Sequence, residues 1–585
     1  MREPGGPGSA GVRVSTLRRV VPGWLGRSLR AARAPFPRAA AVRGALAVSL
    51  PLMVGLLLGQ PVAGVVVGLG GLWAVGQDSA APYKARALRI AALGGSAAVG
   101  LLAGATALRY GDTVGIAALL AVAGLVSGWV SVGGPLASVA GMHLLLGATV
   151  GTGIPVPGPW WAGPLELLGG ALFALALTCL PWLWRRHSPE REAVIAVFDA
   201  AERALSRAGT PGATEARARM TLALNTAQDL LAVHSSRKHA ERETPVGGLI
   251  AAFRAAVHLV EAVTALMVEG RPLPPAVLRV PSLLAARVVP PVRAGRPAPD
   301  GATGHGPEPE PPFAADTPGL RALAEVYRAP GRSLTLLPDP PAYDGPRLAD
   351  RLRFALLLGG CTLAAVVVAQ LLHGPRGYWL PMTVAFLYKP DLGPVFGRAL
   401  NRCLGTVAGV GMVALVAWLV TDQWALTLVA AAFGAVMAAG VRYHYALSTF
   451  GLTVIVFVFI DFLGDDRQLL PSRVLETVIA AALVLTAHFL TRPDSWRVRA
   501  ELRVAAADRA WRRYDRRAPA ASPDERHELR RTAYRRLAEA RQALETAGAE
   551  PHRDPERFPV LERRVARAEE GCDAVTAYVV AGGRR

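Results

Sequence analysis

Three basic residues follow a short apolar stretch in the second half of the chain, and their side chains could bind an anion. Lys389, Arg398 and Arg402 come after residues 377–388, which are uncharged and contain Pro381. A guanidinium group can bind a carboxylate through two parallel hydrogen bonds, and a helix that breaks within a membrane exposes N–H groups that favour an anion. The alternative is that each cation only flanks a membrane span on its cytoplasmic side. We predict a carboxylate-binding site at this position.

Four ionisable residues lie within or beside other apolar stretches, and we expect all of them near span ends. They are His143, Glu166, His444 and Glu476. An ionisable group is costly inside a membrane, so we predict proton coupling as their role. The two acids could instead be stabilised at helix N-termini, Glu476 with Arg473 as its partner, and the histidines could be interfacial.

No pattern in the sequence predicts an enzyme. The four cysteines form no Cys-x-x-Cys pair, and we find no metal-ligand cluster, no Gly-x-x-x-x-Gly-Lys-Ser/Thr phosphate loop and no nucleophile elbow. We therefore expect no catalytic residue, no cofactor and no metal.

The composition places much of the chain in a lipid bilayer. Of its 585 residues, 52% are hydrophobic and 18% are charged, and the mean hydropathy is +0.31. The net charge of +20 comes almost wholly from arginine, because there are only three lysines. These arginines flank apolar runs and form no single basic face with interleaved aromatic residues, which argues against nucleic-acid binding.

Apolar runs of about 17 to 25 residues, the length of a membrane span, occur in two blocks. A basic arm precedes the first block, a helical segment and a Pro-rich linker separate the blocks, and a helical segment ends the chain. The expected bounds are 1–43 for the arm, 44–184 for the first block, 185–270 for the helical segment, 271–346 for the linker, 347–491 for the second block and 492–585 for the last segment. The linker holds 18 of the 46 prolines, and we expect it to be extended, with at most a short helix near 320–327.

The loops between spans differ in charge. Arginine-rich loops alternate with loops that carry Asp112, Asp422 and Asp461. Since positive loops stay in the cytoplasm, we expect a multi-pass protein of the cytoplasmic (inner) membrane with both termini inside.

The order of features suggests that the second block repeats the first. The matched features are Trp73 and Trp379, Asp78 and Asp391, an arginine pair in each block, His143 and His444, and Glu166 and Glu476. Repeats with an even number of spans share one orientation. The expected fold is an all-α polytopic membrane protein with two parallel repeats of about six transmembrane helices, each followed by a cytoplasmic helical segment.

The second block also carries a recognisable series of motifs. They are Tyr-Trp-Leu-Pro-Met-Thr-Val at 378–384, Lys-Pro-Asp-Leu-Gly at 389–393, Arg398, Arg402, Gly-Thr-Val-Ala-Gly at 405–409 and Tyr-His-Tyr-Ala at 443–446. This series resembles the FUSC family, the fusaric acid resistance and aromatic acid exporter type of inner-membrane protein. The likeness is strong over 354–492, whereas the first block lacks the Lys-Pro-Asp motif and the Gly-Thr pair.

The resemblance implies export of small organic anions, such as aromatic carboxylic acids, driven by the proton gradient. Trp379, Tyr388 and Thr406 then join the three basic residues as predicted substrate-binding residues. There are two alternatives to an exporter. The chain could be an anion channel, or it could be a membrane-anchored scaffold that acts through its cytoplasmic helices. The expected partners are the organic anion and the bilayer, and the chain could also form a homo-oligomer or use an accessory export subunit.

Overall fold

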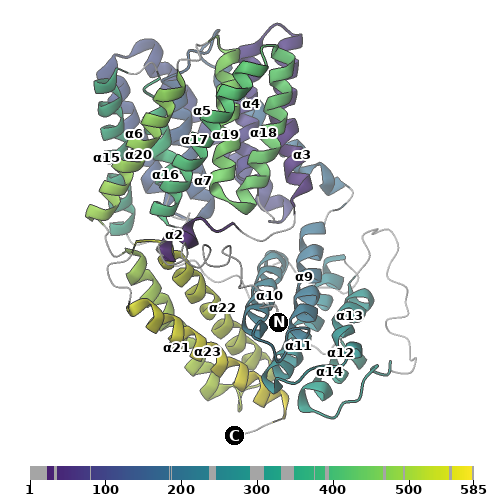
Figure 1. The fold of residues 1–585 in the computed structure, drawn as a ribbon. Coiled ribbons are helices and arrows are strands. Elements are labelled where there is room, and N and C mark those ends of the chain that lie inside the picture. Colours follow the sequence, from purple (N-terminus) through teal and green to yellow (C-terminus); the bar gives the residue numbers. More distant parts are fainter. Residues whose placement is uncertain are drawn as a thin grey trace, which may run out of the picture.

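All regular structure in the described part of the chain is helical. The computed structural model describes residues 23–31, 36–78, 81–183, 185, 187–235, 245–289, 309–330, 348–373, 376–388, 394–464, 469–491, 495–551 and 556–582. An upright bundle of helices forms one end of the molecule, and a second group of helices forms the other end (Figure 1).

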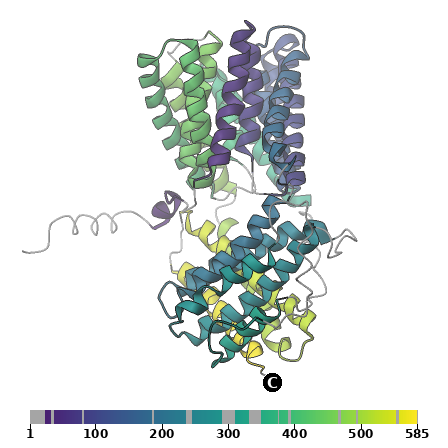
Figure 2. The same ribbon diagram turned by 90° about the vertical axis from the view of Figure 1, so that its right-hand side faces the viewer.

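The upright bundle, which we call the membrane domain, holds twelve helices within the described residues (Figures 1 and 2). Those of the first block are α3 (Arg38–Leu57), α4 (Pro61–Gly76), α5 (Tyr83–Tyr110), α6 (Thr113–Ser131), α7 (Pro135–Gly151) and α8 (Ala162–Cys179), which a short 3-10 helix, η1 (Leu180–Leu183), extends. Those of the second block are α15 (Leu348–Leu372), α16 (Trp379–Leu387), α17 (Val395–Leu419), α18 (Gln423–Tyr443), α19 (Tyr445–Phe462) and α20 (Leu470–Thr491). Six helices in each block confirm the predicted all-α architecture.

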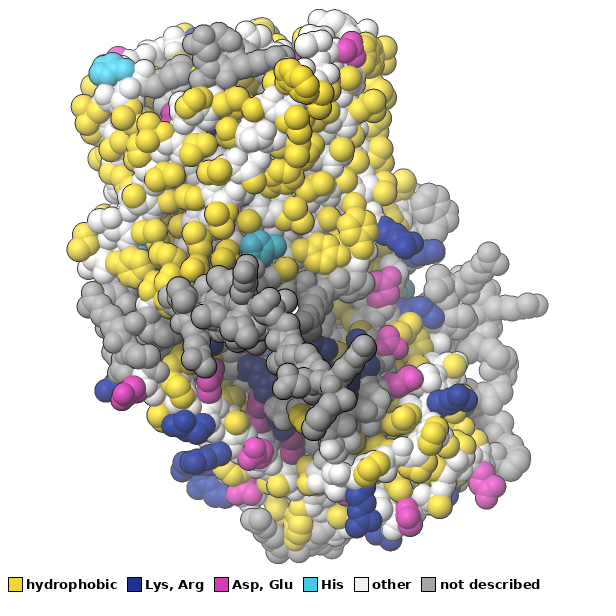
Figure 3. All heavy atoms as spheres, viewed as in Figure 1, with side chains coloured by type: hydrophobic (Ala, Val, Ile, Leu, Met, Phe, Trp, Pro, Cys, Tyr) yellow, Lys and Arg dark blue, Asp and Glu magenta, His cyan; other side chains and the backbone are white. Residues whose placement is uncertain are grey.

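The outer surface of this bundle suits lipid. In Figure 3 hydrophobic side chains cover the upper part of the molecule, whereas charged side chains gather on the lower part. Ten described helices are long and apolar enough to cross a membrane; nine of them belong to the membrane domain, and its α4, α7 and α16 are shorter. The chain is therefore a multi-pass membrane protein.

The tenth apolar helix, α11 (Pro245–Glu269), is the centre of the other domain. Of its apolar window 78% is buried, against at most 56% for the other nine. It contacts α9 (Ser188–Leu205), α10 (Ala213–Ser235) and α14 (Pro318–Arg328). Its apolar surface is thus covered by protein.

The second group of helices, which we call the extramembrane domain, joins both polar segments. Its members besides α9, α10, α11 and α14 are α12 (Pro275–Leu278), α13 (Val280–Val288), α21 (Ser495–Arg517), α22 (Pro523–Gly548) and α23 (Arg557–Val580). One apolar core lies within α9–α14 and another within α21–α23. Helix α14 matches the short helix that we expected near 320–327, whereas α12 and α13 fall in a part of that segment that we expected to be extended. They pack on α9 through Val277, Val280 and Leu284, which are fully buried.

The two blocks of the membrane domain share one packing order. Helix α3 contacts α4, α4 contacts α8, α5 contacts α7 and α8, and α6 contacts α7; the same pairs recur in the second block from α15 to α20. Contacts between blocks are reciprocal, since α6 packs on α15 and α18 packs on α3. Two related units would pack in this way. Common origin of the blocks stays a prediction.

Two of the matched features occupy different places in the blocks. Trp73 lies near the end of α4, whereas Trp379 is the first residue of α16. His143 lies in the middle of α7, so its expected place near a span end is wrong, and His444 directly precedes α19. These side chains are not positional equivalents.

Candidate anion-binding site

Helix α16 is too short to cross a membrane. Its nine residues span about 13 Å, less than half of a hydrocarbon layer of about 30 Å. Pro381 lies in its first turn, where a missing N–H group costs no helical hydrogen bond. Eight of the nine residues are buried. The expectation of a short second span in this block is confirmed, whereas α4, its counterpart, has 16 residues.

Arg398 holds the end of this short helix. Its Nη1 atom donates a hydrogen bond of 2.7 Å to the carbonyl oxygen of Leu387, the last residue of α16. A cation at a helix C-terminus also stabilises the carbonyl groups that have no partner within the helix. Because Arg398 belongs to α17, is only 6% exposed and donates to the end of α16, it holds the two helices together.

Two further arginines lie beside α16, one on each of two helices that contact it. Arg402 of α17 lies over the ring of Phe386 at 4.5 Å, and Arg473 of α20 lies over the ring of Trp379 at 5.0 Å. Each arginine is 2% exposed. The aromatic rings of α16 thus hold two buried cations.

These two guanidinium groups have unused hydrogen-bond donors. The Nε atom of Arg402 and the Nε and Nη1 atoms of Arg473 are buried without an acceptor. Arg473 also interacts electrostatically with Arg402 and with Glu476, which follows it by one turn of α20. Glu476 is 4% exposed, and its Oε2 atom has no partner. The cluster offers positive charge and free N–H groups to an anion.

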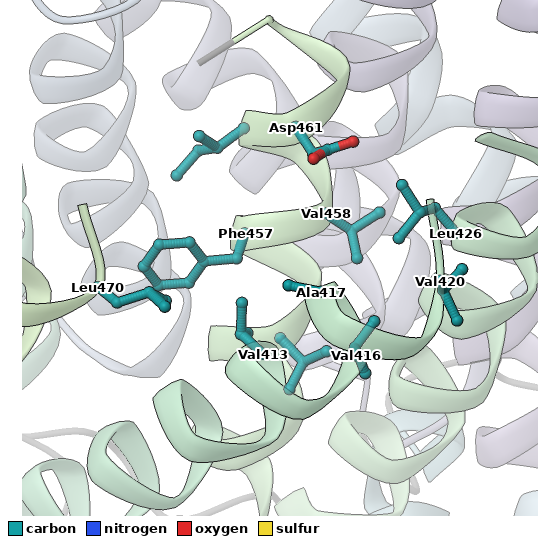
Figure 4. Close-up of a pocket in the computed structure, with 11 residues that line it drawn as sticks. Val413, Val416, Ala417, Val420, Leu426, Phe457, Val458, Asp461 and Leu470 are labelled. Atoms are coloured by element: carbon teal, nitrogen blue, oxygen red, sulfur yellow. The ribbon is translucent and has the colours of Figure 1, made fainter. Parts of the chain in front are cut away.

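An apolar cavity adjoins this cluster. It lies between α17, α18, α19 and α20, and valine, leucine and phenylalanine side chains line it, with the Asp461 carboxylate at its edge (Figure 4). Phe457 lines the cavity and also contacts the ring of Trp379, at 5.8 Å between ring centres. Leu470, which lines it too, precedes Arg473 by one turn. Apolar walls and the arginine cluster are therefore neighbours.

The structure brings part of the predicted substrate-binding set together. Trp379 and Arg402 belong to the cluster, and Thr406 lies one turn after Arg402, 1% exposed and with its hydroxyl unpartnered. Tyr388 directly follows α16 and stacks on Phe354 of α15, at 5.3 Å between ring centres. Lys389 lies outside the described residues.

The residues predicted for proton coupling are dispersed. Glu476 alone belongs to the arginine cluster. Glu166 lies in α8 with its Oε2 atom unpartnered, and His143 lies in α7, where its Nδ1 atom is 2.8 Å from the carbonyl oxygen of Val139. His444 lies at the start of α19 with its Nε2 atom unpartnered.

The corresponding region of the first block has its charges paired. Asp78 accepts two hydrogen bonds from Arg86, both of 2.8 Å, and one of 2.6 Å from Arg43. A carboxylate of the chain itself thus occupies the guanidinium groups there. Unused donors occur in both blocks, since the Nε atoms of Arg43 and Arg89 are also buried without an acceptor; the difference is that no carboxylate of the described residues hydrogen-bonds to Arg402 or Arg473.

Sequence reasoning missed Arg473 as a binding residue, together with Phe386 and Phe457. Arg473 was noticed only as a partner for Glu476. Its place near the start of a span made it look like a flanking charge, and only the fold brings it to Trp379. An arginine followed one turn later by a glutamate inside an apolar helix was the signal that could have found it.

Comparison with known proteins places this site inside a family match. Residues 363–487 match the fusaric acid resistance protein-like family. The uncharacterized membrane protein YvaC of Bacillus subtilis is 29% identical over 36% of this chain and 33% of its own length. The uncharacterized protein slr1298 of Synechocystis is 32% identical over 25% of this chain and 19% of its own, and the inner membrane protein YccS of Escherichia coli is 26% identical over 25% and 20%.

Each match thus spans a third or less of these relatives. No solved structure matches the chain. The matched segment runs from α15 into α20 and contains Trp379, Arg402, Arg473 and Glu476. The chain is a multi-pass membrane protein whose residues 363–487, in the second membrane block, are similar to the fusaric acid resistance protein-like family.

Proposed function

We propose that this chain is an inner-membrane transporter that exports small organic anions such as aromatic carboxylic acids, with both termini in the cytoplasm. The observation that carries the proposal is the pair of buried arginines, Arg402 and Arg473, whose donors lack acceptors beside the short helix α16. The family match supports a role in transport.

The cost of these arginines argues for function. Removal of an arginine from water is costly, and each buried donor without an acceptor adds about 1–3 kcal/mol. A desolvated contact with an aromatic ring returns about 2 kcal/mol. Burial of both arginines therefore does not stabilise the fold by itself, and a carboxylate that bridges them would supply the missing acceptors.

The surroundings favour a carboxylate that carries an aromatic ring. The rings of Trp379, Phe386 and Phe457 lie at or next to the arginines, and the apolar cavity continues from Phe457 (Figure 4). Aromatic pairs contribute about 0.5–1.5 kcal/mol beyond their buried area. The substrate ring would occupy these apolar walls while its carboxylate contacts Arg402 and Arg473.

Glu476 is the group that we propose for proton coupling. It follows Arg473 by one turn, so that a substrate carboxylate at Arg473 and a charged Glu476 would repel each other. Substrate binding would then favour the protonated form of Glu476, and substrate release would favour the charged form. That alternation carries a proton in the same direction as the anion, so export through this site would follow the outward concentration gradient of the anion, and an inward proton gradient would oppose it.

Export of labelled benzoate from cells or proteoliposomes tests the proposed site. Arg402→Gln and Arg473→Gln remove one charge each while keeping a polar side chain. We expect each to slow export by about tenfold or more, since a hydrogen bond to a charged group contributes about 1.5–3 kcal/mol. The matched control is Arg442→Gln, an exposed arginine at the end of α18, which should keep normal export. Full export by the double variant Arg402→Gln/Arg473→Gln would refute the proposed site.

A further inference from the structure

A basic and aromatic surface lies where the chain leaves the first membrane block for the extramembrane domain. Helix α5 begins at Tyr83, and η1 extends the end of α8 to Leu183. The hydroxyl groups of Tyr83 and of Ser188, the first residue of α9, share a hydrogen bond of 3.1 Å. The start of α5 and the end of α8 therefore lie at the same end of the bundle, the end from which α9 continues into the extramembrane domain.

The packing of α5 on α8 places a lysine and a tryptophan at similar depth on this surface. The two helices touch at Gly94, where an added Cβ atom would lie 2.8 Å from the Cβ atom of Ala171. Lys84 precedes Gly94 by ten residues, and Trp182 follows Ala171 by eleven. Each therefore lies about 15–18 Å from that contact, toward the extramembrane domain. Arg185 follows Trp182 by three residues and extends the same surface.

The two cations on this surface form no ion pair within the described residues. Lys84 and Arg185 are both exposed. Asp78, the acid nearest to Lys84 in the sequence, is bound to two other arginines. Glu190, the acid nearest to Arg185, is 3% exposed and forms no ion pair with it. The surface thus carries positive charge that no carboxylate of the described residues balances.

Exposed apolar side chains lie beside these cations. Trp182 is 41% exposed, and Leu88 of α5 and Leu180 of η1 are 56% and 50% exposed. Tryptophan is enriched at the border between lipid headgroups and acyl chains, and basic residues at that border attract anionic headgroups. Exposed leucine side chains suit the acyl chains. The surface therefore matches a molecule with an anionic head and long apolar chains.

We propose that this surface binds one anionic phospholipid, whose phosphate lies between Lys84 and Arg185. Its acyl chains contact Leu88 and Leu180, and the Trp182 ring lies at the level of the glycerol group. Because Lys84 is in the first turn of α5 and Arg185 leads into α9, one headgroup bridges the membrane domain and the start of the extramembrane domain. Neither residue belongs to the arginine cluster, so the lipid site is independent of the proposed transport function.

Native mass spectrometry of the full-length protein in detergent, titrated with phosphatidylglycerol, tests this site. We expect the tightest phosphatidylglycerol to bind at least tenfold more strongly than phosphatidylcholine with the same acyl chains, because only phosphatidylglycerol carries a net negative charge. Lys84→Gln and Arg185→Gln should each weaken phosphatidylglycerol binding about fivefold and leave phosphatidylcholine binding unchanged. Arg321→Gln removes the same charge from an exposed position on α14, and this control should bind phosphatidylglycerol as the parent does.

Further variants separate binding from folding. Lys84→Arg keeps the positive charge and should keep the affinity of the parent. Since Lys84 and Arg185 are exposed, both glutamine variants should keep the unfolding temperature of the parent in lipid-free detergent. Unchanged phosphatidylglycerol affinity in the double variant Lys84→Gln/Arg185→Gln would overturn the proposal. Glycerol 3-phosphate carries a phosphate without acyl chains, and equally tight binding of this compound would overturn the assignment to a lipid.

Discussion

The groups that surround each arginine determine which of its hydrogen-bond donors remain available to a ligand. Arg398 is bound to the Leu387 carbonyl group and serves the backbone, whereas Arg402 and Arg473 face aromatic rings and keep donors unused. A ring attracts a cation through its face but accepts no strong hydrogen bond. The rings thus hold the guanidinium groups in place without saturating them, which suits a ligand that must also leave.

Glu476→Gln tests coupling at this cluster. The amide cannot take up or release a proton, but it keeps the shape of the side chain near Arg473. We expect benzoate exchange across proteoliposomes to continue, and benzoate accumulation driven by a pH gradient to fall at least tenfold. Glu192→Gln, an exposed acid of α9, should leave both measurements unchanged.

The outcome distinguishes a coupled transporter from a channel. A channel carries anions without regard to the proton gradient, so the parent protein would show passive current and Glu476→Gln would not alter it. Gradient-driven accumulation that survives Glu476→Gln would assign coupling to another group.

The sequence predicted several residues of the candidate site, but it did not predict which residues each of them contacts. Glu476 was predicted because ionisable residues are costly inside apolar runs, Arg402 because it follows a short span, and Trp379 through the family resemblance. The role of Arg398 as a cap and the contact of Arg473 with Trp379 depend on which face of each helix meets α16. A hydropathy profile does not show which face of a helix meets its neighbours.

At the scale of elements, apolar length predicted most spans, and its errors have physical causes. Helix α11 is as apolar as a span, yet it is the buried centre of the extramembrane domain. The helices that precede it in the chain, α9 and α10, are polar, and this context distinguishes α11 from a membrane span where apolar length does not. Helices α12 and α13 were missed because prolines at their starts were interpreted as a linker, although proline suits the first turn of a helix.

One junction links elements of the two domains. Helix α2 (Gly23–Ser28), from the basic arm, lies between α17 and α22. Ser28 donates a hydrogen bond of 2.8 Å to the carbonyl oxygen of Ala549, and its own carbonyl oxygen accepts one of 3.0 Å from Asn401. Beside it, Glu550 accepts a hydrogen bond of 3.1 Å from the backbone N–H of Phe396, at the start of α17.

Glu550 should make this junction sensitive to pH. Burial raises the pKa of Glu550 from 4.5 to about 7, since hydrogen bonds from the backbone of Phe396 and Val395 and the charge of Arg398 offset the burial only in part. A raised pKa in the folded state stabilises the fold fully below pH 4.5, and this contribution is lost as the pH rises through 7. From pH 5 to 8 we expect a loss of about 1–3 kcal/mol from this residue.

Thermal unfolding of the purified protein between pH 5 and 8 measures the effect. Glu550→Gln still accepts the Phe396 hydrogen bond but cannot ionise, so its unfolding temperature should fall less across this range than that of the parent. Glu545→Gln, an exposed acid in the last turn of α22, which ends shortly before Glu550, should follow the parent. Identical pH profiles for parent and Glu550→Gln would contradict the expected role of Glu550.

For the whole molecule, the sequence predicted two membrane blocks and two polar segments but not their association. Each polar segment has its own apolar core, and both are joined through charged residues far apart in the sequence. Arg217 of α10 binds Glu569 at 3.1 Å and also Asp573, both on α23. Partners separated in this way leave no local pattern in a sequence.

If the chain is instead a membrane-anchored scaffold, its activity resides in the extramembrane domain. Deletion of residues 188–270 would remove α9, α10 and α11 and expose the core that they share with α13 and α14. Such a deletion would unfold the domain whichever function is correct. A single substitution at the seam, where the two polar segments meet, is therefore the sharper test.

Arg217→Met should weaken the association of the two segments. It leaves the buried Glu569 and Asp573 carboxylates with fewer partners, and removal of one member of a buried ion pair costs about 3–5 kcal/mol. Because Arg541 and Tyr534 still bind these acids, we expect about 3 kcal/mol, seen as a lower unfolding temperature and faster proteolysis of the domain.

The matched control is Arg535→Met, which breaks the 2.8 Å pair with Asp229 on the same seam. The Asp229 side chain is 50% exposed, so this loss should cost only about 0–1 kcal/mol. Equal unfolding temperatures for the two variants would show that the buried pair does not hold the seam. If Arg217→Met loosens the domain while benzoate export continues, transport resides in the membrane domain, whereas loss of export in step with unfolding would favour action through the extramembrane helices.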